Sequence, residues 1–153
     1  MASLDDIVEL FELLGDWEQR YQYLTELGEK LPVMPTALKT EANKVRACMS
    51  QVWVCACRDE HAPETIRFYG DCDTSIIKGV LAVLIQLASG KTAAEVEQLN
   101  VDELFSRLNL YEHLSPNRHV GVYAIVEQMK RQVRTLQASS CVCHDTSQSS
   151  IEC

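Results

Sequence analysis

The order of apolar and polar residues predicts a chain that begins and ends in helices. Apolar residues recur at intervals of three and four from Leu4 to Leu14 and again from Trp17 to Leu31, which is the spacing of one helical face. A third, more apolar helix is expected over residues 76–88. Capping patterns and renewed helical spacing predict three further helices, which begin near Thr92, Val101 and Pro116.

The centre of the chain has the pattern of a small antiparallel sheet. From Gln51 to Arg58 the apolar residues occupy both alternating faces, which is typical of a strand that is covered on both sides. The polar segment 59–64 predicts a hairpin connection, and residues 65–69 alternate as an antiparallel neighbour would. We therefore predict an α+β fold in which a small three-stranded antiparallel sheet packs against helices.

Composition limits the class of protein further. The chain has 153 residues, of which 46% are hydrophobic, and this suffices for one domain with a core of its own. Its formal net charge of −8 argues against a nucleic-acid partner, because phosphate binding needs clustered lysine and arginine. The N-terminus lacks the basic region of a signal peptide, and the longest apolar stretch, residues 76–87, is too short to cross a bilayer. We expect a soluble, cytoplasmic protein with no membrane partner.

The end of the chain has a different composition. Residues 139–153 are rich in Ser, Thr and Cys and have no helical periodicity, which predicts a disordered tail after a single domain over residues 1–138. The tail contains Cys141, Cys143 and Cys153, and the sequence leaves the role of these three thiols open.

Seven cysteines raise the question of which thiol has a chemical role. Their spacing is unlike that of a secreted disulfide framework, so each is core packing, a ligand or a nucleophile. Cys48 follows an irregular polar segment, 34–47, and precedes the first strand, where a thiol is sheltered and yet reachable through loop motion.

One alternative to a reactive Cys48 is a zinc- or iron–sulfur-binding scaffold that uses four cysteines, namely Cys48, Cys55, Cys57 and Cys72. Another is a sulfurtransferase with a small donor such as thiosulfate, although the sequence offers no rhodanese-like loop.

Short motifs spread along the chain point to one family through their order and spacing. They are Trp17-Glu18 with Tyr21, Glu26-Leu27-Gly28, Asn43-Lys44-Val45, Cys48-Met49-Ser50-Gln51-Val52-Trp53, Gly70-Asp71-Cys72-Asp73, Ile77-Lys78-Gly79 and His113-Leu114-Ser115-Pro116-Asn117-Arg118. With these motifs, residues 4 to 137 resemble the SufE-like sulfur acceptors, the partner proteins of cysteine desulfurases in iron–sulfur cluster assembly.

The resemblance implies that Cys48 takes up sulfane sulfur, as a persulfide, from a pyridoxal-phosphate-dependent cysteine desulfurase of the SufS-like or CsdA-like kind. It implies that the protein stimulates that enzyme and passes the sulfur to an iron–sulfur assembly scaffold complex. In this role the protein is a covalent carrier and not an independent enzyme, and we expect no cofactor or metal of its own. A fold similar to that of iron–sulfur scaffold proteins is also implied, which agrees with the α+β pattern.

Six further residues are expected to support the Cys48 site: Gln51, Trp53, Asp71, Asp73, Lys78 and Arg118. We interpret the first two as structural support for the loop, and the two acids as turn and helix-capping residues. An unperturbed cysteine has a pKa of about 8.5, so a cation near Cys48 would favour the attacking thiolate, and Lys78 and Arg118 are both candidates. For Arg118, a plain surface charge at a helix start is an equally open interpretation.

Overall fold

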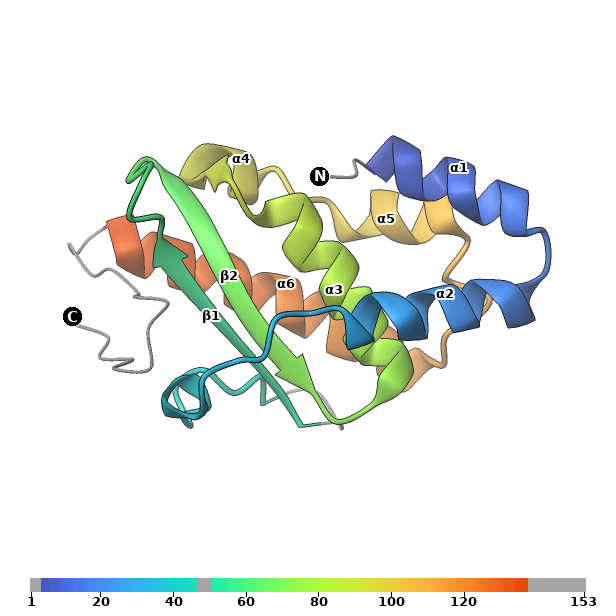
Figure 1. Ribbon diagram of the computed structural model, residues 1–153, viewed down its shortest axis with the longest axis horizontal. Coiled ribbons are helices and arrows are strands. Elements are labelled where there is room, and N and C mark those ends of the chain that lie inside the picture. The colour runs from blue at the N-terminus through green and yellow to red at the C-terminus, as the bar shows by residue number, and fades with distance from the viewer. Residues whose placement is uncertain (1–3, 47–50, 138–153) are drawn as a thin grey trace.

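The computed structural model describes residues 4–46 and 51–137, and within them it shows helices around a three-stranded antiparallel sheet (Figure 1). The elements are α1 (Leu4–Leu14), α2 (Trp17–Glu29), the 3-10 helix η1 (Thr36–Leu38), β1 (Val52–Arg58), β2 (Thr65–Cys72), α3 (Ser75–Ala88), β3 (Lys91–Thr92), α4 (Ala93–Glu97), α5 (Val101–Leu108) and α6 (Pro116–Gln137). The predicted α+β fold is confirmed. Residues 1–3, 47–50 and 138–153 lie outside the described part, and with them Cys48 and the predicted tail.

The sheet has the order β1-β2-β3. Strands β1 and β2 pair over their whole length, from Val52 opposite Cys72 to Arg58 opposite Ile66, and β3 adds two residues beside the start of β2. Strand β2 runs three residues further than the alternation over 65–69 predicts, because residues 70–72 pair with the beginning of β1.

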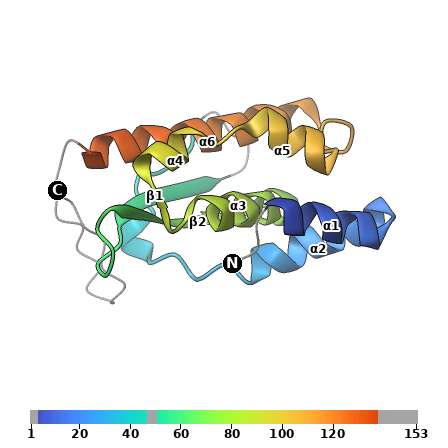
Figure 2. The ribbon, with the colours of Figure 1, turned by 90° about the horizontal axis from the view of Figure 1, so that it is seen from above.

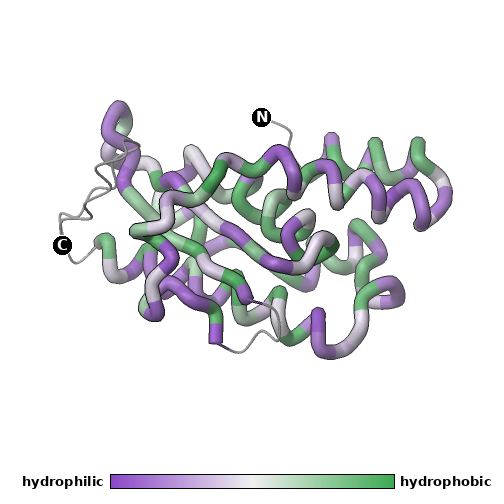
Figure 3. The backbone as a smooth tube through the Cα atoms, turned by 60° about the horizontal axis from the view of Figure 1, so that its bottom comes forward, coloured by the Kyte–Doolittle hydropathy of each residue, from purple (hydrophilic) through white to green (hydrophobic). Residues whose placement is uncertain are grey.

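Both faces of β1 are covered, as its sequence predicts. Its even-numbered residues from 52 to 56 are buried in the main hydrophobic core, which lies between the sheet and the helices. Helix α3 packs on β2 and α6 packs along β1, so the helices form layers beside the sheet (Figure 2). On the peripheral helices, hydrophobic and hydrophilic positions alternate around the turns, as expected for helices with one buried face (Figure 3).

Helices α2 and α3 cross where two glycines meet. A Cβ added at Gly28 would lie 3.0 Å from the backbone nitrogen of Gly79, and a Cβ at Gly79 would lie 2.6 Å from the carbonyl carbon of Leu24. The two backbones therefore approach closer than any larger residue allows. This crossing fixes the N-terminal half of α3, which includes Lys78, against α2.

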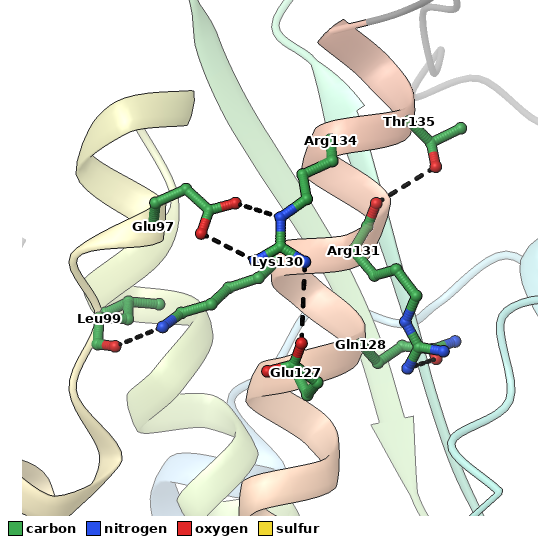
Figure 4. Close-up of polar contacts among 8 residues, drawn as sticks. All are labelled: Glu97, Leu99, Glu127, Gln128, Lys130, Arg131, Arg134 and Thr135. Atoms are coloured by element: carbon green, nitrogen blue, oxygen red, sulfur yellow. Dashed lines mark hydrogen bonds and ion pairs between the residues drawn. The ribbon is translucent and has the colours of Figure 1, made fainter.

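Helix α4 is fastened to α6 by polar contacts (Figure 4). The Arg134 guanidinium donates to both carboxylate oxygens of Glu97, at 2.7 and 3.0 Å, and the Lys130 ammonium donates to the carbonyl of Leu99 at 2.8 Å. The capping box predicted at the start of α4 is also present, because the side chains of Thr92 and Glu95 each accept a backbone N–H from the other residue.

The second face of the sheet is covered by residues 34–46, which we call the arm. Met34 and Leu38 of the arm bury Cys55, Cys57 and Tyr69 in a small hydrophobic cluster. The sequence predicts this segment as irregular, whereas its last residues pair with the free edge of β1, with a bridge between Lys44 and Trp53.

No helix in the ranges 4–46 and 51–137 has both the length and the hydropathy that a membrane crossing requires.

Candidate functional site

The segment that contains Cys48 begins and ends at one point of the sheet. The backbone N–H of Val45 donates to the carbonyl of Val52 at 2.8 Å, and the N–H of Val54 donates to the carbonyl of Asn43 at 2.9 Å. Residues 46–51 therefore connect two paired positions. Cys48 itself lies outside the described residues, but it is three residues from Val45, so its Cα is at most about 11 Å from that residue's Cα.

Asp73 holds the C-terminal end of this segment. The backbone N–H of Gln51 donates to Asp73 Oδ1, the N–H of Asp73 donates to the carbonyl of Gln51, and both distances are 3.1 Å. The expectation that Asp73 caps α3 is wrong: Thr74 occupies the N-cap position, without a side-chain cap, and its hydroxyl donates to Asp73 Oδ1 at 3.2 Å. Asp73 is thus used to fix the entrance of β1, because the strand pairing brings it beside Gln51.

Asp71 is the centre of a charged cluster beside this entrance. Its carboxylate accepts from Lys39 Nζ at 2.6 Å and lies 3.2 Å from Lys78 Nζ, and it also accepts the backbone N–H of Cys72 at 2.8 Å. Burial acts to raise the pKa of Asp71, but these donors and the charge of Lys78 outweigh it, so the pKa is lowered. The second ammonium group of this cluster is balanced by the carboxylate of Asp73, which lies at the same entrance.

Trp53 joins this cluster from β1. It lies opposite Asp71 in the sheet register, and the Lys39 ammonium lies 5.5 Å from the centre of its ring. Lys39 is a member of the cluster that the sequence does not predict. Lys39 and Asp71 are 32 positions apart, and no local pattern relates them. The structure therefore brings together five of the six supporting residues, namely Gln51, Trp53, Asp71, Asp73 and Lys78.

Arg118, the sixth, makes no hydrogen bond or ion pair to this cluster within the described residues. It is in the first turn of α6, where its backbone N–H donates to the carbonyl of Ser115 at 2.9 Å. Within residues 4–46 and 51–137 no ion pair joins its guanidinium to Asp71 or to any other acid. A role for Arg118 beside Cys48 stays a prediction.

The motifs near the start of the chain support the turn that leads into α6. The rings of Trp17 and His113 stack with their centres 3.7 Å apart and their planes 18° apart. The Tyr21 hydroxyl donates to the carbonyl of His113 at 2.5 Å. These two aromatic residues of α2 therefore fix the residues that precede Pro116, and this explains how motifs almost one hundred positions apart belong to one structure.

The cysteines of the described part lie on opposite faces of the sheet. Cys72 is in the main core on the helix-covered face, whereas Cys55 and Cys57 lie under the arm with their Sγ atoms 3.7 Å apart. Burial raises the pKa of the Cys55 thiol to about 11, although a hydrogen bond with Asn43 acts in the opposite direction. The expectation that Cys72 approaches Cys55 and Cys57 as a shared metal site is therefore wrong, because the sheet separates them. The described ranges contain no group of three or more His, Cys, Asp or Glu side chains that could hold a metal ion.

Gln132 of α6 is a second residue near the site that the sequence does not predict. Its side-chain amide contacts the free edge of β1, where Nε2 donates to the carbonyl of Val54 at 2.8 Å and Oε1 accepts the N–H of Ala56 at 2.9 Å. On sequence grounds Gln132 is one polar residue on a long amphipathic helix, with no signal that separates it from its neighbours.

Comparisons with known proteins agree with the fold and with the motifs. The SufE family profile, described as an Fe–S metabolism associated domain, matches residues 5–133. The chain is similar to a SufE-like protein of Rhizobium meliloti, with 39% identity over 132 residues, 85% of this chain and 94% of the relative. It is also similar to a SufE-like protein of Rhizobium etli, with 38% identity over 141 residues, 91% and 95% of the two chains. The solution structure of a hypothetical protein from Thermus thermophilus has a similar fold, with a TM-score of 0.71 and 24% identity over 89% of this chain and 96% of that chain.

Proposed function

Since this chain belongs to the SufE family, whose domain is associated with Fe–S metabolism, we propose that it accepts sulfane sulfur from a cysteine desulfurase on Cys48 and passes it to an iron–sulfur assembly complex. The observation that carries the proposal is the closed base of the Cys48 segment, which is paired at Val45 and Val52. A segment whose two ends are fixed to one strand keeps the residues between them within a few residue lengths of that strand.

The transfer is a thiol–persulfide exchange. The Cys48 thiolate attacks the outer sulfur of the desulfurase persulfide, a new S–S bond forms on Cys48, and the S–S bond of the donor breaks. The donor cysteine leaves as a thiolate and takes up a proton from solvent, so no external oxidant or reductant is needed. The same exchange in the next step moves the sulfur from Cys48 to a thiol of the assembly complex.

The charged side chains beside the entrance of β1 bear on this reaction. The ammonium groups of Lys39 and Lys78 lie in this cluster, on the carboxylate of Asp71, while the carboxylate of Asp73 lies at Gln51, so the four side chains together carry no net charge. Positive charge favours the thiolate over the thiol and lowers the pKa of a nearby cysteine.

The partners follow from the same proposal. A SufS-like or CsdA-like cysteine desulfurase is the donor, and an iron–sulfur scaffold complex is the recipient, both in the cytoplasm. The protein acts as a carrier and as an activator of the desulfurase, because acceptance of the sulfur frees the enzyme's own cysteine for the next turnover. No observation favours a zinc- or iron–sulfur-binding scaffold, since Cys72 lies across the sheet from Cys55 and Cys57.

The proposal is tested by incubating the protein with a cysteine desulfurase and cysteine and mapping the added mass of one sulfur atom by mass spectrometry. We expect the sulfur on Cys48, and we expect Cys48→Ser to abolish both the labelling and the stimulation of the desulfurase. Cys72→Ser is the matched control, because Cys72 is buried on the far face and its loss leaves Cys48 in place. Sulfur on Cys72 or on Cys141 with none on Cys48 would contradict the proposal.

A further inference from the structure

The amide of Gln132 continues the pairing of β1 where the arm stops. The arm pairs with this edge of β1 only as far as Asn43, whose carbonyl accepts the N–H of Val54 at 2.9 Å. The next two backbone groups of the edge, the Val54 carbonyl and the Ala56 N–H, are both satisfied by Gln132, at 2.8 and 2.9 Å. A primary amide carries the same donor and acceptor as a peptide group, so the side chain of Gln132 takes the place of the next strand residue.

The same amide holds the arm. Gln132 Nε2 also donates to Asn43 Oδ1 at 3.2 Å, and Asn43 Nδ2 donates to the carbonyl of Leu38 at 2.7 Å. One helical turn earlier, Gln128 Nε2 donates to the carbonyl of Ala42 at 3.1 Å. Figure 4 shows Gln128 on the side of α6 away from Glu97, so one side of the helix is fastened to α4 and another side to the arm.

The apolar contacts of the arm are few. Most of it covers a separate cluster of five buried residues, Met34, Leu38, Cys55, Cys57 and Tyr69, and only Val45 at its end is buried in the main core, which is several times larger. A segment with little buried apolar area opens at lower free energy than the core, so its polar contacts account for a large part of its attachment. Gln132 and Asn43 are the inner members of this set of contacts, because both are partly buried at the sheet edge.

We propose that Gln132 is a positioning residue for sulfur transfer, because it holds Asn43 against β1 and thereby fixes the base of the Cys48 segment. The inference rests on the proposed function and adds a residue to it. Cys48 follows the paired residue Val45 by only three positions, so a displacement of the arm moves the thiol that must meet the donor persulfide. The role differs from general stabilisation because the contacts of Gln132 are to the arm and to the edge of β1.

Two variants of Gln132 test the proposal, with the full chain and a desulfurase in the sulfur-mapping assay above. Gln132→Leu removes all three hydrogen bonds, and Gln132→Glu keeps an acceptor for Ala56 but has no donor for Asn43. We expect both to accept sulfur on Cys48 roughly tenfold more slowly than the wild type, since contacts of this kind each change an equilibrium by several fold. In the folded variants, alkylation of Cys55 by iodoacetamide should rise by a similar factor, while Cys72 stays protected.

The control is Val133→Ala, in the same helix. Val133 is fully buried in the main core, so this variant loses stability while the amide of Gln132 and its hydrogen bonds stay in place. We expect it to keep the wild-type rate of sulfur acceptance and to leave Cys55 protected at temperatures where it is folded.

Two results would overturn the positioning role. In the first, Gln132→Leu accepts sulfur at the same rate as the wild type. In the second, iodoacetamide alkylates Cys55 and Cys72 equally in the variants, which would mean general unfolding. If the wild type itself receives no sulfur on Cys48, the proposed function fails, and the contrast between Cys55 and Cys72 in the variants still reports whether Gln132 holds the arm.

Discussion

The crossing of α2 and α3 gives a sharp prediction for the substitution Gly79→Ala. The added Cβ would lie 2.6 Å from the carbonyl carbon and 2.9 Å from the Cβ of Leu24, and nearer still to the carbonyl oxygen. The obstacle is helix backbone, which cannot rotate away as a side-chain end can. To restore ordinary contact, the two helices must separate by roughly 1 Å in a close-packed interior, because the carbonyl oxygen is the nearest atom.

The expected loss of stability follows from two opposed effects. Forcing a methyl group into a packed site costs about 1–3 kcal/mol, and here the upper end applies because three atoms of Leu24 are in the way. Alanine in a helix is more favourable than glycine by about 1 kcal/mol, which offsets part of this cost. We expect Gly79→Ala to lower the free energy of unfolding by about 2 kcal/mol and the Tm by roughly 4–8 °C.

The measurement is urea and thermal unfolding followed by circular dichroism, with Gly28→Ala as the matched variant on the facing helix. An added Cβ at Gly28 lies no closer than 3.0 Å to its neighbours, so we expect a smaller loss there. The double variant should lose less than the sum of the two, because helices already pushed apart by one methyl accept the second more easily. A Gly79→Ala protein as stable as the wild type, or a larger loss at Gly28, would refute the packing argument.

Three further predictions concern single side chains. The pKa of Asp71 is lowered in the folded state, so the stabilisation by its carboxylate is present above the unfolded pKa of about 3.9 and is lost as the pH falls through the folded value. Asp71→Asn should therefore lower the free energy of unfolding by about 1 kcal/mol at pH 7 and leave it unchanged near pH 2. A loss of stability that is the same at every pH would contradict this. The pKa of Cys55 is raised to about 11, so at pH 8 iodoacetamide should modify it in the folded protein about a hundredfold more slowly than in urea, and equal rates would show that the thiol is not buried. Tyr21→Phe removes the hydroxyl that donates to the His113 carbonyl and should lower the free energy of unfolding in urea by about 1 kcal/mol. An unchanged free energy of unfolding would show that this hydrogen bond does not stabilise the turn before α6.

Much of the fold is decided by local patterns that the sequence displays. Periods of 3.6 and of two residues determine which segments can bury one face as a helix or a strand, so the pattern predicts the helices and β1 close to their observed ends, and β2 at its start. Caps are equally local, because donor and acceptor are three positions apart, and the predicted Thr92–Glu95 box is present. The burial of β1 on both sides also follows from its own residues, although the sequence does not say what covers the second face.

The site depends on relations that no local pattern contains. Lys39 reaches Asp71 because the arm crosses the sheet, Cys72 is separated from Cys55 because the register of β1 and β2 places them on opposite faces, and Gln132 replaces a strand residue because α6 runs along β1.

The sequence by itself thus determined the α+β class, the order of the elements and the motifs that led to Cys48. The tertiary structure alone decided which side chains surround the base of the Cys48 segment and which thiols are kept apart. The physical reason is that periodicity and caps act over a few residues. Register, helix crossing and the choice of a hydrogen-bond partner depend instead on segments that meet only when the whole core is packed.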